Sequence, residues 1–265
     1  MFCCFMADGV WGWYNQISKS GFAVLELEKN MLKILQTDRG YDSNLKQYTI
    51  KDGVLSFVLF GIMILNYSIV AVLEIKFEFI KENILLVGCI FNALMIVITM
   101  LFIKFNKQGL DTIGLYKGKW KNSIIMGIIL ASFLFYNNCL SHFINGSHFI
   151  ALPKILMLLL YYFLVAICEE VVFRGYTGTR IYGLIKKKWL AIFIVGVLFI
   201  IMHFPYRMIA YGMTLNDLTV KNFSWIIDLF ITHLVLNFIY LKTNSLYGAI
   251  IPHWISNFAY EIILK

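Results

Sequence analysis

The sequence predicts an all-α fold: a polytopic membrane helix bundle of about seven to eight transmembrane helices with a polar site inside the bilayer. Two observations carry this prediction. Of the 265 residues, 60% are hydrophobic and only 14% are charged, whereas an average soluble domain is roughly 45–50% apolar and about 25% charged. Several apolar stretches are also long enough to cross a bilayer. A soluble globular enzyme is excluded, because so many aromatic and aliphatic side chains could not share one core without large exposed apolar patches.

A membrane-crossing helix needs about 20 mostly apolar residues. Seven segments meet or approach this length, and the first three carry no charge. They are 54–73, 83–103, 122–144, 155–168, 189–204, 224–241 and 246–264. The fourth segment meets Glu169 and Glu170, and we expect its helix to continue past Arg174 to about Tyr182.

Charge predicts the domain organisation and the topology. Residues 1–53 have a mixed polar pattern, so we expect a cytoplasmic N-terminal extension followed by a transmembrane domain over 54–265. Cytoplasmic loops of membrane proteins collect Lys and Arg, and 17 of the 23 basic residues fall on one side of a seven-span topology, the side of the N-terminus. We therefore predict a multi-pass protein of the cell membrane with a cytoplasmic N-terminus. The net charge of +8 then reflects topology, and no nucleic-acid partner is expected.

Ionisable residues inside apolar spans are costly and usually mark function. Glu170 and Arg174 are four residues apart, so they share a helix face and can pair, whereas Glu169 is turned about 100° away from that face. The same spacing of four recurs in two further pairs. These are Phe199 with His203, and His253 with Asn257.

The depth of these residues in the membrane provides an independent argument that they lie together. Glu169 lies 17 residues before Lys186 and His203 lies 17 residues after it, so an antiparallel helical hairpin around this basic turn would place both side chains at one height. His253 and Asn257 enter from the same side and reach a similar zone. Three helices can thus deliver one Glu, two His and one Asn to a single buried place.

Such a cluster is suited to hydrolysis of an amide bond by activated water. A buried carboxylate such as Glu169 can act as a general base, imidazoles can share or donate the proton, and the Asn257 amide can donate to a developing oxyanion. Alternatively, Glu169, His203 and His253 could hold Zn²⁺ in a catalytic site with an open position. The sequence contains no HExxH motif, and it leaves the choice between the two open.

Each member also has a purely structural interpretation. Glu170 and Arg174 could form an ion pair at a helix end, and a single intramembrane His often makes a hydrogen bond between helices. Asp228 and His233 in the sixth span are predicted to be such interhelical contacts. Only the set as a whole favours catalysis.

Three segments carry a resemblance to a known family. "EEVVFRG" (169–175), "FIIMH" (199–203) and "HWISN" (253–257) resemble the EExxxR, FxxxH and HxxxN motifs of the CAAX-protease and bacteriocin-processing (CPBP, or Abi) family of intramembrane proteases. The likeness extends over roughly 85–265, including "LKTNSLYGAIIPHWISN" (241–257) and "DTIGLYKGKW" (111–120). The resemblance implies a multi-helix membrane protease with a polar active site inside the bilayer, opening toward the cytosol.

The resemblance also implies a role for each of the site residues. Glu169 would activate the water together with His203, His253 and Asn257 would stabilise the oxyanion, and Glu170, Arg174 and Phe199 would organise the site. The family is often described as metal-dependent, so zinc stays a possible cofactor here. Eukaryotic members trim prenylated CaaX proteins, and bacterial members are linked with peptide maturation or bacteriocin immunity. A composition rich in Ile, Lys, Phe and Asn is typical of a low-GC bacterium and favours the second role.

Three functional classes follow. The first is an intramembrane endopeptidase whose peptide or protein substrate enters from the membrane or the cytosol. The second is a non-enzymatic bacteriocin-immunity membrane protein, which would tolerate Glu169→Gln. The third is a proton-coupled transporter, which predicts repeat symmetry and broken helices in matched halves. The sequence carries neither of these transporter features, and the first class is preferred.

Overall fold

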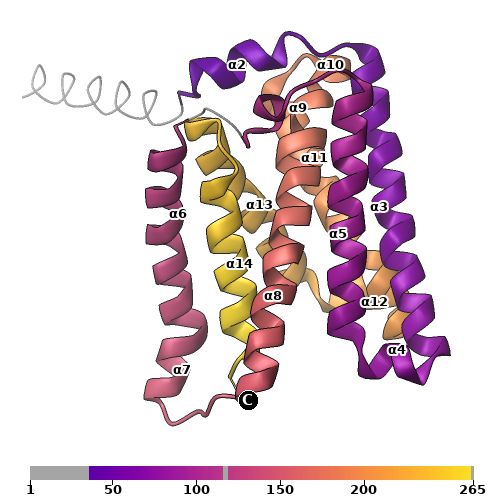
Figure 1. Ribbon diagram of the computed structural model, residues 1–265, viewed down its shortest axis with the longest axis vertical. Helices are drawn as coiled ribbons and strands as arrows, with labels where there is room; N and C mark the ends of the chain where they lie inside the picture. Colours follow the sequence, from indigo (N-terminus) through magenta and orange to yellow (C-terminus); the bar gives the residue numbers. More distant parts are fainter. Residues whose placement is uncertain (1–35, 116–118, 264–265) are drawn as a thin grey trace, which may run out of the picture. The chain divides into compact units, whose positions relative to one another are not determined.

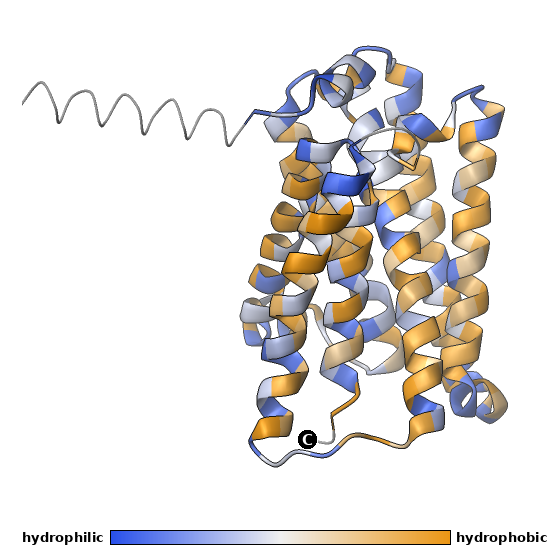
Figure 2. Ribbon diagram, turned by 60° about the vertical axis from the view of Figure 1, so that its left-hand side comes forward, coloured by the Kyte–Doolittle hydropathy of each residue, from blue (hydrophilic) through white to orange (hydrophobic). Residues whose placement is uncertain are grey.

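The outer surface of the helices is apolar, as lipid contact requires (Figure 2). The computed structural model describes residues 36–115 and 119–263, and Asp38 to Lys265 form one compact unit. Within the described residues the secondary structure is helical, without a β-strand. In chain order the elements are α2 Arg39–Leu45, α3 Ile50–Lys76, α4 Glu78–Glu82, α5 Ile84–Phe105, η1 Leu110–Ile113, α6 Trp120–Phe135, η2 Tyr136–Leu140, α7 Ser141–Ile144, α8 Leu152–Glu169, η3 Glu170–Thr177, α9 Gly178–Arg180, α10 Tyr182–Ile185, α11 Lys188–Met202, α12 Phe204–Ala210, η4 Asp217–Lys221, α13 Phe223–Thr243 and α14 Tyr247–Glu261.

The polytopic helix bundle predicted from the sequence is confirmed. Among the described residues, six helical runs are long and apolar enough to cross a membrane. They are Ile50–Lys76, Ile84–Phe105, Trp120–Ile144, Leu152–Ile185, Lys188–Ala210 and Phe223–Thr243. The fourth continues past Arg174 to Ile185, as expected from its sequence. The chain is therefore a multi-pass membrane protein.

The seventh predicted span is shorter than the other six. Helix α14 has 15 residues, which gives a length of about 22 Å, less than the hydrocarbon core. It lies beside α6 and α8 (Figure 1), where Pro252 is tolerated in a helix interior because neighbouring helices surround it.

Helices α6 and α14 approach each other closely at two glycines. A Cβ on Gly127 would lie 2.9 Å from the Cα of Gly248, and a Cβ on Gly248 would lie 2.4 Å from the carbonyl oxygen of Ser123. Small residues at helix interfaces let the backbones come together in membranes. The Ser123 hydroxyl accepts a hydrogen bond from the Gly248 amide at 2.8 Å, which ties the start of α14 to α6.

One end of the bundle is held by a buried arginine. The Arg180 side chain is fully buried, and its Nη2 donates to Gln108 at 2.6 Å and to Thr112 at 2.7 Å. The guanidinium also lies over the rings of Tyr48 and Tyr176, 4.7 and 4.3 Å from their centroids. The cluster joins the segment before α3, the loop after α5 and the end of the fourth span.

Part of the predicted N-terminal extension contacts this end of the bundle. The backbone amide of Asp38 donates to the carbonyl of Leu241 at 2.8 Å, and Tyr41 packs edge-on against Tyr240 of α13 at 5.5 Å. Residues 1–35 of the extension lie outside the described residues. The boundary between residues 53 and 54 stays a prediction.

The two polar residues of the sixth span differ in their surroundings. His233 is buried, and its Nε2 lies 3.1 Å from the carbonyl oxygen of Ile192 in α11, so the predicted interhelical contact is confirmed. For Asp228 that prediction is wrong. Its side chain is exposed, because it lies on the same exposed stripe of α13 as Ser224 and Ile231.

Candidate active site

The first motif lies at a change of helix geometry. Helix α8 ends at Glu169, and the chain continues as the π-helical segment η3 from Glu170 to Thr177, in which every residue is buried. Arg174 Nη1 donates to Glu170 Oε1 at 2.8 Å, and both side chains are completely buried, as the spacing of four predicts. π-Helical segments are frequent at functional sites.

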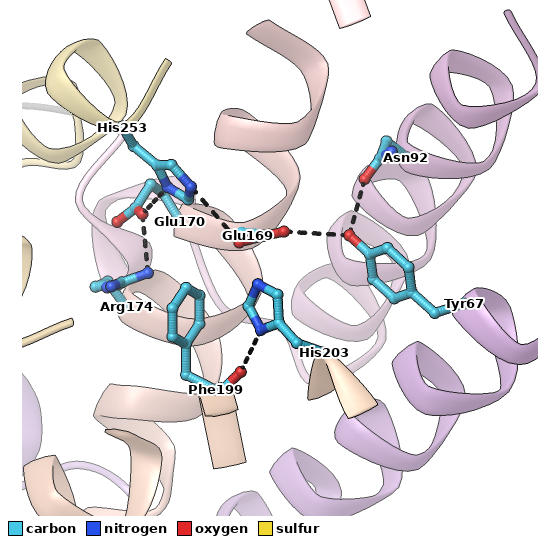
Figure 3. A network of polar contacts seen from close by, with 8 residues as sticks. All are labelled: Tyr67, Asn92, Glu169, Glu170, Arg174, Phe199, His203 and His253. Carbon is cyan, nitrogen blue, oxygen red and sulfur yellow. Dashed lines mark hydrogen bonds and ion pairs between the residues drawn. The ribbon is translucent and has the colours of Figure 1, made fainter. Parts of the chain in front are cut away.

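Glu169 points away from this ion pair, toward helices α3 and α14 (Figure 3). Its side chain is almost fully buried. Oε1 accepts a hydrogen bond from the hydroxyl of Tyr67 at 3.3 Å. Oε2 lies 3.6 Å from His253 Nε2 and accepts no hydrogen bond from the described residues. One carboxylate oxygen is therefore held and the other is available.

His253 connects the two glutamates. Its Nδ1 lies 2.7 Å from Glu170 Oε1, and its Nε2 is the atom near Glu169. Because an ionised carboxylate only accepts hydrogen bonds, Nδ1 carries a hydrogen and donates it to Glu170. Nε2 therefore faces Glu169 either as a lone pair or, in the protonated ring, as a second N–H group.

His203 has its tautomer set by its own helix. Its Nδ1 lies 2.8 Å from the carbonyl oxygen of Phe199, and since a carbonyl only accepts, Nδ1 carries the hydrogen. The other ring nitrogen is then an acceptor and points toward Glu169 (Figure 3). Phe199 also supports Arg174, whose guanidinium carbon lies 4.6 Å from the centre of its ring.

Two cavities meet at this site. The first lies between α3, α5, α8 and α12, and the second lies between α6, α11, α13 and α14. Both are lined by Glu169 and His203. The Glu169 carboxylate therefore borders open space on two sides.

The four predicted catalytic residues converge. Glu169, His203, His253 and Asn257 all line the second cavity, although they come from three helices. Asn257 lies one turn after His253 on α14, and its side chain makes no hydrogen bond with the described residues. The predicted organising residues Glu170, Arg174 and Phe199 lie directly behind this group, all of them buried.

Tyr67 and Asn92 belong to the site although no sequence motif indicates them. Both are uncharged and lie in spans without charge, so the pattern of ionisable groups does not include them. Tyr67 OH lies within reach of Glu169 and 3.4 Å from Asn92 Oδ1. A buried Asn such as Asn92 in an apolar helix is a signal that could have found them, because polar side chains inside membranes need partners.

The zinc alternative stays a prediction. Among the described residues no group of three or more His, Cys, Asp or Glu side chains is arranged to hold a metal ion. Glu169, His203 and His253 nevertheless line one cavity. Nδ1 of each imidazole is directed at another protein group, which leaves the other ring nitrogen on the side of Glu169 (Figure 3), as is usual for histidines that bind a metal.

Comparison with known proteins bears on the same segment. A family model described as Type II CAAX prenyl endopeptidase Rce1-like matches residues 150–259. No curated protein and no solved structure matches the chain. The matched segment contains all three motifs and every residue of the polar cluster except Tyr67 and Asn92. The resemblance that the motifs indicate is thereby confirmed over residues 150–259, where the chain is similar to the CAAX endopeptidase family.

Proposed function

We propose that this chain is an intramembrane endopeptidase that hydrolyses a peptide bond with water activated by Glu169 and His203. The observation that carries the proposal is the buried Oε2 atom of Glu169, which accepts no hydrogen bond from the described residues and belongs to a side chain lining both cavities. A carboxylate oxygen in this setting is placed to accept a proton from water. The acceptor nitrogen of His203 lies on the same side and can share that proton.

The geometry around His253 supports a second role for this residue. Glu170 holds its ring through Nδ1, and His253 and Asn257 line the same cavity. In the protonated ring, Nε2 carries a hydrogen that it can donate. His253 and Asn257 can then both donate to the oxygen that becomes negative when water attacks the carbonyl carbon.

The reaction then needs one proton to move twice. Glu169 takes it from water as the water oxygen bonds to the carbonyl carbon. Glu169 or His203 returns it to the amide nitrogen as the C–N bond breaks, so the products are a carboxylic acid and an amine. Proton transfer by a positioned side chain typically contributes about 10²–10⁴-fold in rate.

The surroundings suggest where the substrate lies. We infer that the end of the bundle bearing α2, α9 and α10 faces the cytoplasm, since it carries the basic turn 186–188 and the basic loop before α6. The substrate is a peptide or protein segment that enters from the membrane or the cytosol. Its role is maturation of a bacteriocin or signalling peptide, or self-immunity. A prenylated CaaX substrate, the class in the family's description, is the alternative.

The decisive experiment compares cells that express the wild type and Glu169→Gln at equal membrane levels. Peptides are profiled by mass spectrometry for precursors that accumulate only in the variant. Glu82→Gln is the matched control, because Glu82 is an exposed carboxylate at the end of α4. Proteolysis is supported if cells with Glu169→Gln accumulate a precursor that lacks one defined cut, and if this precursor is absent from cells with the wild type or Glu82→Gln. The precursor also identifies the substrate.

Two results count against the proposal. Identical peptide profiles in wild type and Glu169→Gln contradict proteolysis. Host protection that survives in Glu169→Gln favours the non-enzymatic immunity protein.

A further inference from the structure

An arginine lines the first cavity without a partner of opposite charge. Arg207 lies on α12, four residues after His203, and its side chain is half-buried. Within the described residues its guanidinium makes no ion pair and donates no hydrogen bond. The cavity that it lines reaches Glu169. Because a guanidinium carries a permanent charge and five N–H donors, Arg207 is available to bind an anion.

An aromatic ring holds the guanidinium in place. Its central carbon lies 4.0 Å from the centre of the Trp225 ring, which is a cation–π contact. Trp225 also packs edge-on against His203, with 5.9 Å between the ring centres. One indole ring of α13 therefore contacts both Arg207 and the imidazole of the candidate active site. A cation–π contact uses none of the N–H groups as hydrogen-bond donors, so these stay available to a ligand.

A second polar side chain lines this cavity without a partner. Asn66 of α3 is only 7% exposed, and its amide makes no hydrogen bond with the described residues. Buried polar groups normally have hydrogen-bond partners. A side-chain amide both donates and accepts, so it is complementary to the N–H and C=O groups of a peptide. Asn66 thus indicates, independently of Arg207, a ligand with peptide-like polar groups.

The charges of the cavity give such a ligand a direction. Among the described residues that line it, Arg207 is the one Lys or Arg, and Glu169 is the one Asp or Glu. Glu74 of α3 accepts a hydrogen bond from Tyr206 but makes no ion pair with Arg207. A ligand that spans the cavity is therefore expected to place a negative group at Arg207 and an uncharged part at Glu169, because like charges repel.

We propose that Arg207 binds a carboxylate of the substrate, and that the first cavity holds the substrate segment between this carboxylate and the peptide bond that is cut. Guanidinium groups pair with carboxylates through two parallel hydrogen bonds. The inference rests on the proposed function and deepens it, since it gives the substrate a chemical class: a peptide with a negative charge close to the cut. The charge belongs either to the C-terminal carboxylate or to an Asp or Glu side chain.

The test follows the Trp225 ring by fluorine NMR of the full-length protein in nanodiscs, labelled with 5-fluorotryptophan. Trp225→Phe identifies the resonance. Three probes are titrated: acetylated alanyl-leucyl-alanine as the free acid, the same peptide as the amide, and acetylated alanyl-aspartyl-alanine amide. At least one of the two charged probes is expected to bind about tenfold more tightly than the uncharged amide, because a hydrogen bond to a charged group contributes about this factor.

The two charged probes distinguish the sources of the carboxylate. Tighter binding of the free acid alone assigns the site to a C-terminus, and tighter binding of the aspartyl amide assigns it to an acidic side chain. Both results support the inference. Equal affinity of all three probes for the wild type, or no binding of any of them at millimolar concentration, overturns it.

Variants test whether Arg207 is responsible. Arg207→Gln should remove the preference for the charged probes without weakening the uncharged amide. Arg39→Gln is the matched control, because Arg39 is exposed at the start of α2, and it should keep the preference. Asn66→Leu should weaken all three probes by the same factor. Thermal unfolding identifies a misfolded variant, and Arg207→Lys, which keeps the charge but loses the paired donors, then replaces Arg207→Gln.

A lipid contact is the competing interpretation, because an arginine near the end of a span can extend to the headgroups. The Trp225 resonance is therefore compared in nanodiscs of neutral phosphatidylcholine and in nanodiscs that contain anionic phosphatidylglycerol. A shift that depends on Arg207 and on the lipid charge, combined with equal affinity for the three peptides, assigns Arg207 to the lipid surface and overturns the inference.

Cleavage separates this inference from the proposed function. If wild type and Glu169→Gln give the same peptides in cells while a charged probe still binds more tightly than the amide, the proposed function fails and the carboxylate site stands. If Glu169→Gln loses cleavage but the three probes bind equally, only the inference fails. Where both hold, Arg207→Gln should raise KM for the identified substrate about tenfold and leave kcat nearly unchanged.

Discussion

Nδ1 of His253 lies 2.7 Å from Oε1 of Glu170, although the two residues are 83 positions apart in the chain. This contact sets which nitrogen of the imidazole carries a hydrogen and directs the other toward Glu169. The two adjacent glutamates differ in their surroundings, because Glu170 Oε1 contacts a guanidinium and an imidazole, whereas Glu169 lines both cavities. The second glutamate therefore contacts two neighbours that also belong to the motifs.

The Glu170–Arg174 pair should be essential for stability. Breaking a fully buried ion pair leaves one uncompensated charge and costs about 3–5 kcal/mol, so Glu170→Gln should lower the free energy of unfolding by this order. Denaturant unfolding in detergent micelles measures the change. Adding Arg174→Met removes the stranded guanidinium and should recover part of the loss. Equal stability of wild type and Glu170→Gln would contradict the argument.

Asn257→Ala should reduce turnover without reducing stability. If the amide donates to the oxyanion, its loss lowers kcat by about 10²–10³-fold and leaves KM nearly unchanged. The assay uses the peptide found by mass spectrometry. Asn137→Ala is the control, because Asn137 is exposed and its side-chain amide donates to the carbonyl of Phe133, one turn earlier in the same helical run. A change confined to KM would assign Asn257 to substrate binding instead.

The contact between α6 and α14 should not tolerate one added methyl group. In Gly248→Ala the new Cβ would meet the Ser123 backbone at 2.4 Å, and overpacking of this kind costs about 1–3 kcal/mol. Gly61→Ala is the matched control, since nothing lies within 4 Å of a Cβ there. It should be neutral or gain about 0.5–1 kcal/mol from better helix propensity. The melting temperature should therefore fall for Gly248→Ala, whereas for Gly61→Ala it should stay the same or rise.

The orientation can be tested by cysteine labelling in intact cells. With Cys3 and Cys4 replaced by Ser, the three remaining cysteines are buried. We expect Lys187→Cys to react with a membrane-impermeant maleimide only after permeabilisation, and His148→Cys to react before it. The reverse pattern would place the N-terminus outside and contradict the positive-inside assignment.

The sequence was sufficient for the features that depend on helix spacing. The Glu170–Arg174 pair follows from a separation of four residues, and the common depth of Glu169 and His203 follows from equal distances to the basic turn. Contacts between distant helices could not be derived in this way. The Tyr67 bond to Glu169 depends on how α3 packs, which no local pattern specifies.

The same lack of information on how helices pack explains where the structure differs from the sequence predictions. Asp228 was expected to face another helix, but hydropathy does not tell which side of a span meets a neighbour, and its side chain is exposed. The last apolar segment was long enough by composition, yet α14 is formed over 15 residues only.

The packing of Tyr41 on Tyr240 has a consequence for biogenesis. A segment that is synthesised early must contact a helix that is synthesised late. Helix α13 has to be inserted before α2 can pack and before the amide of Asp38 can bond to Leu241. This end of the bundle is thus completed only after α13 has left the ribosome, and a chain truncated before α13 would expose the Tyr41 ring to solvent.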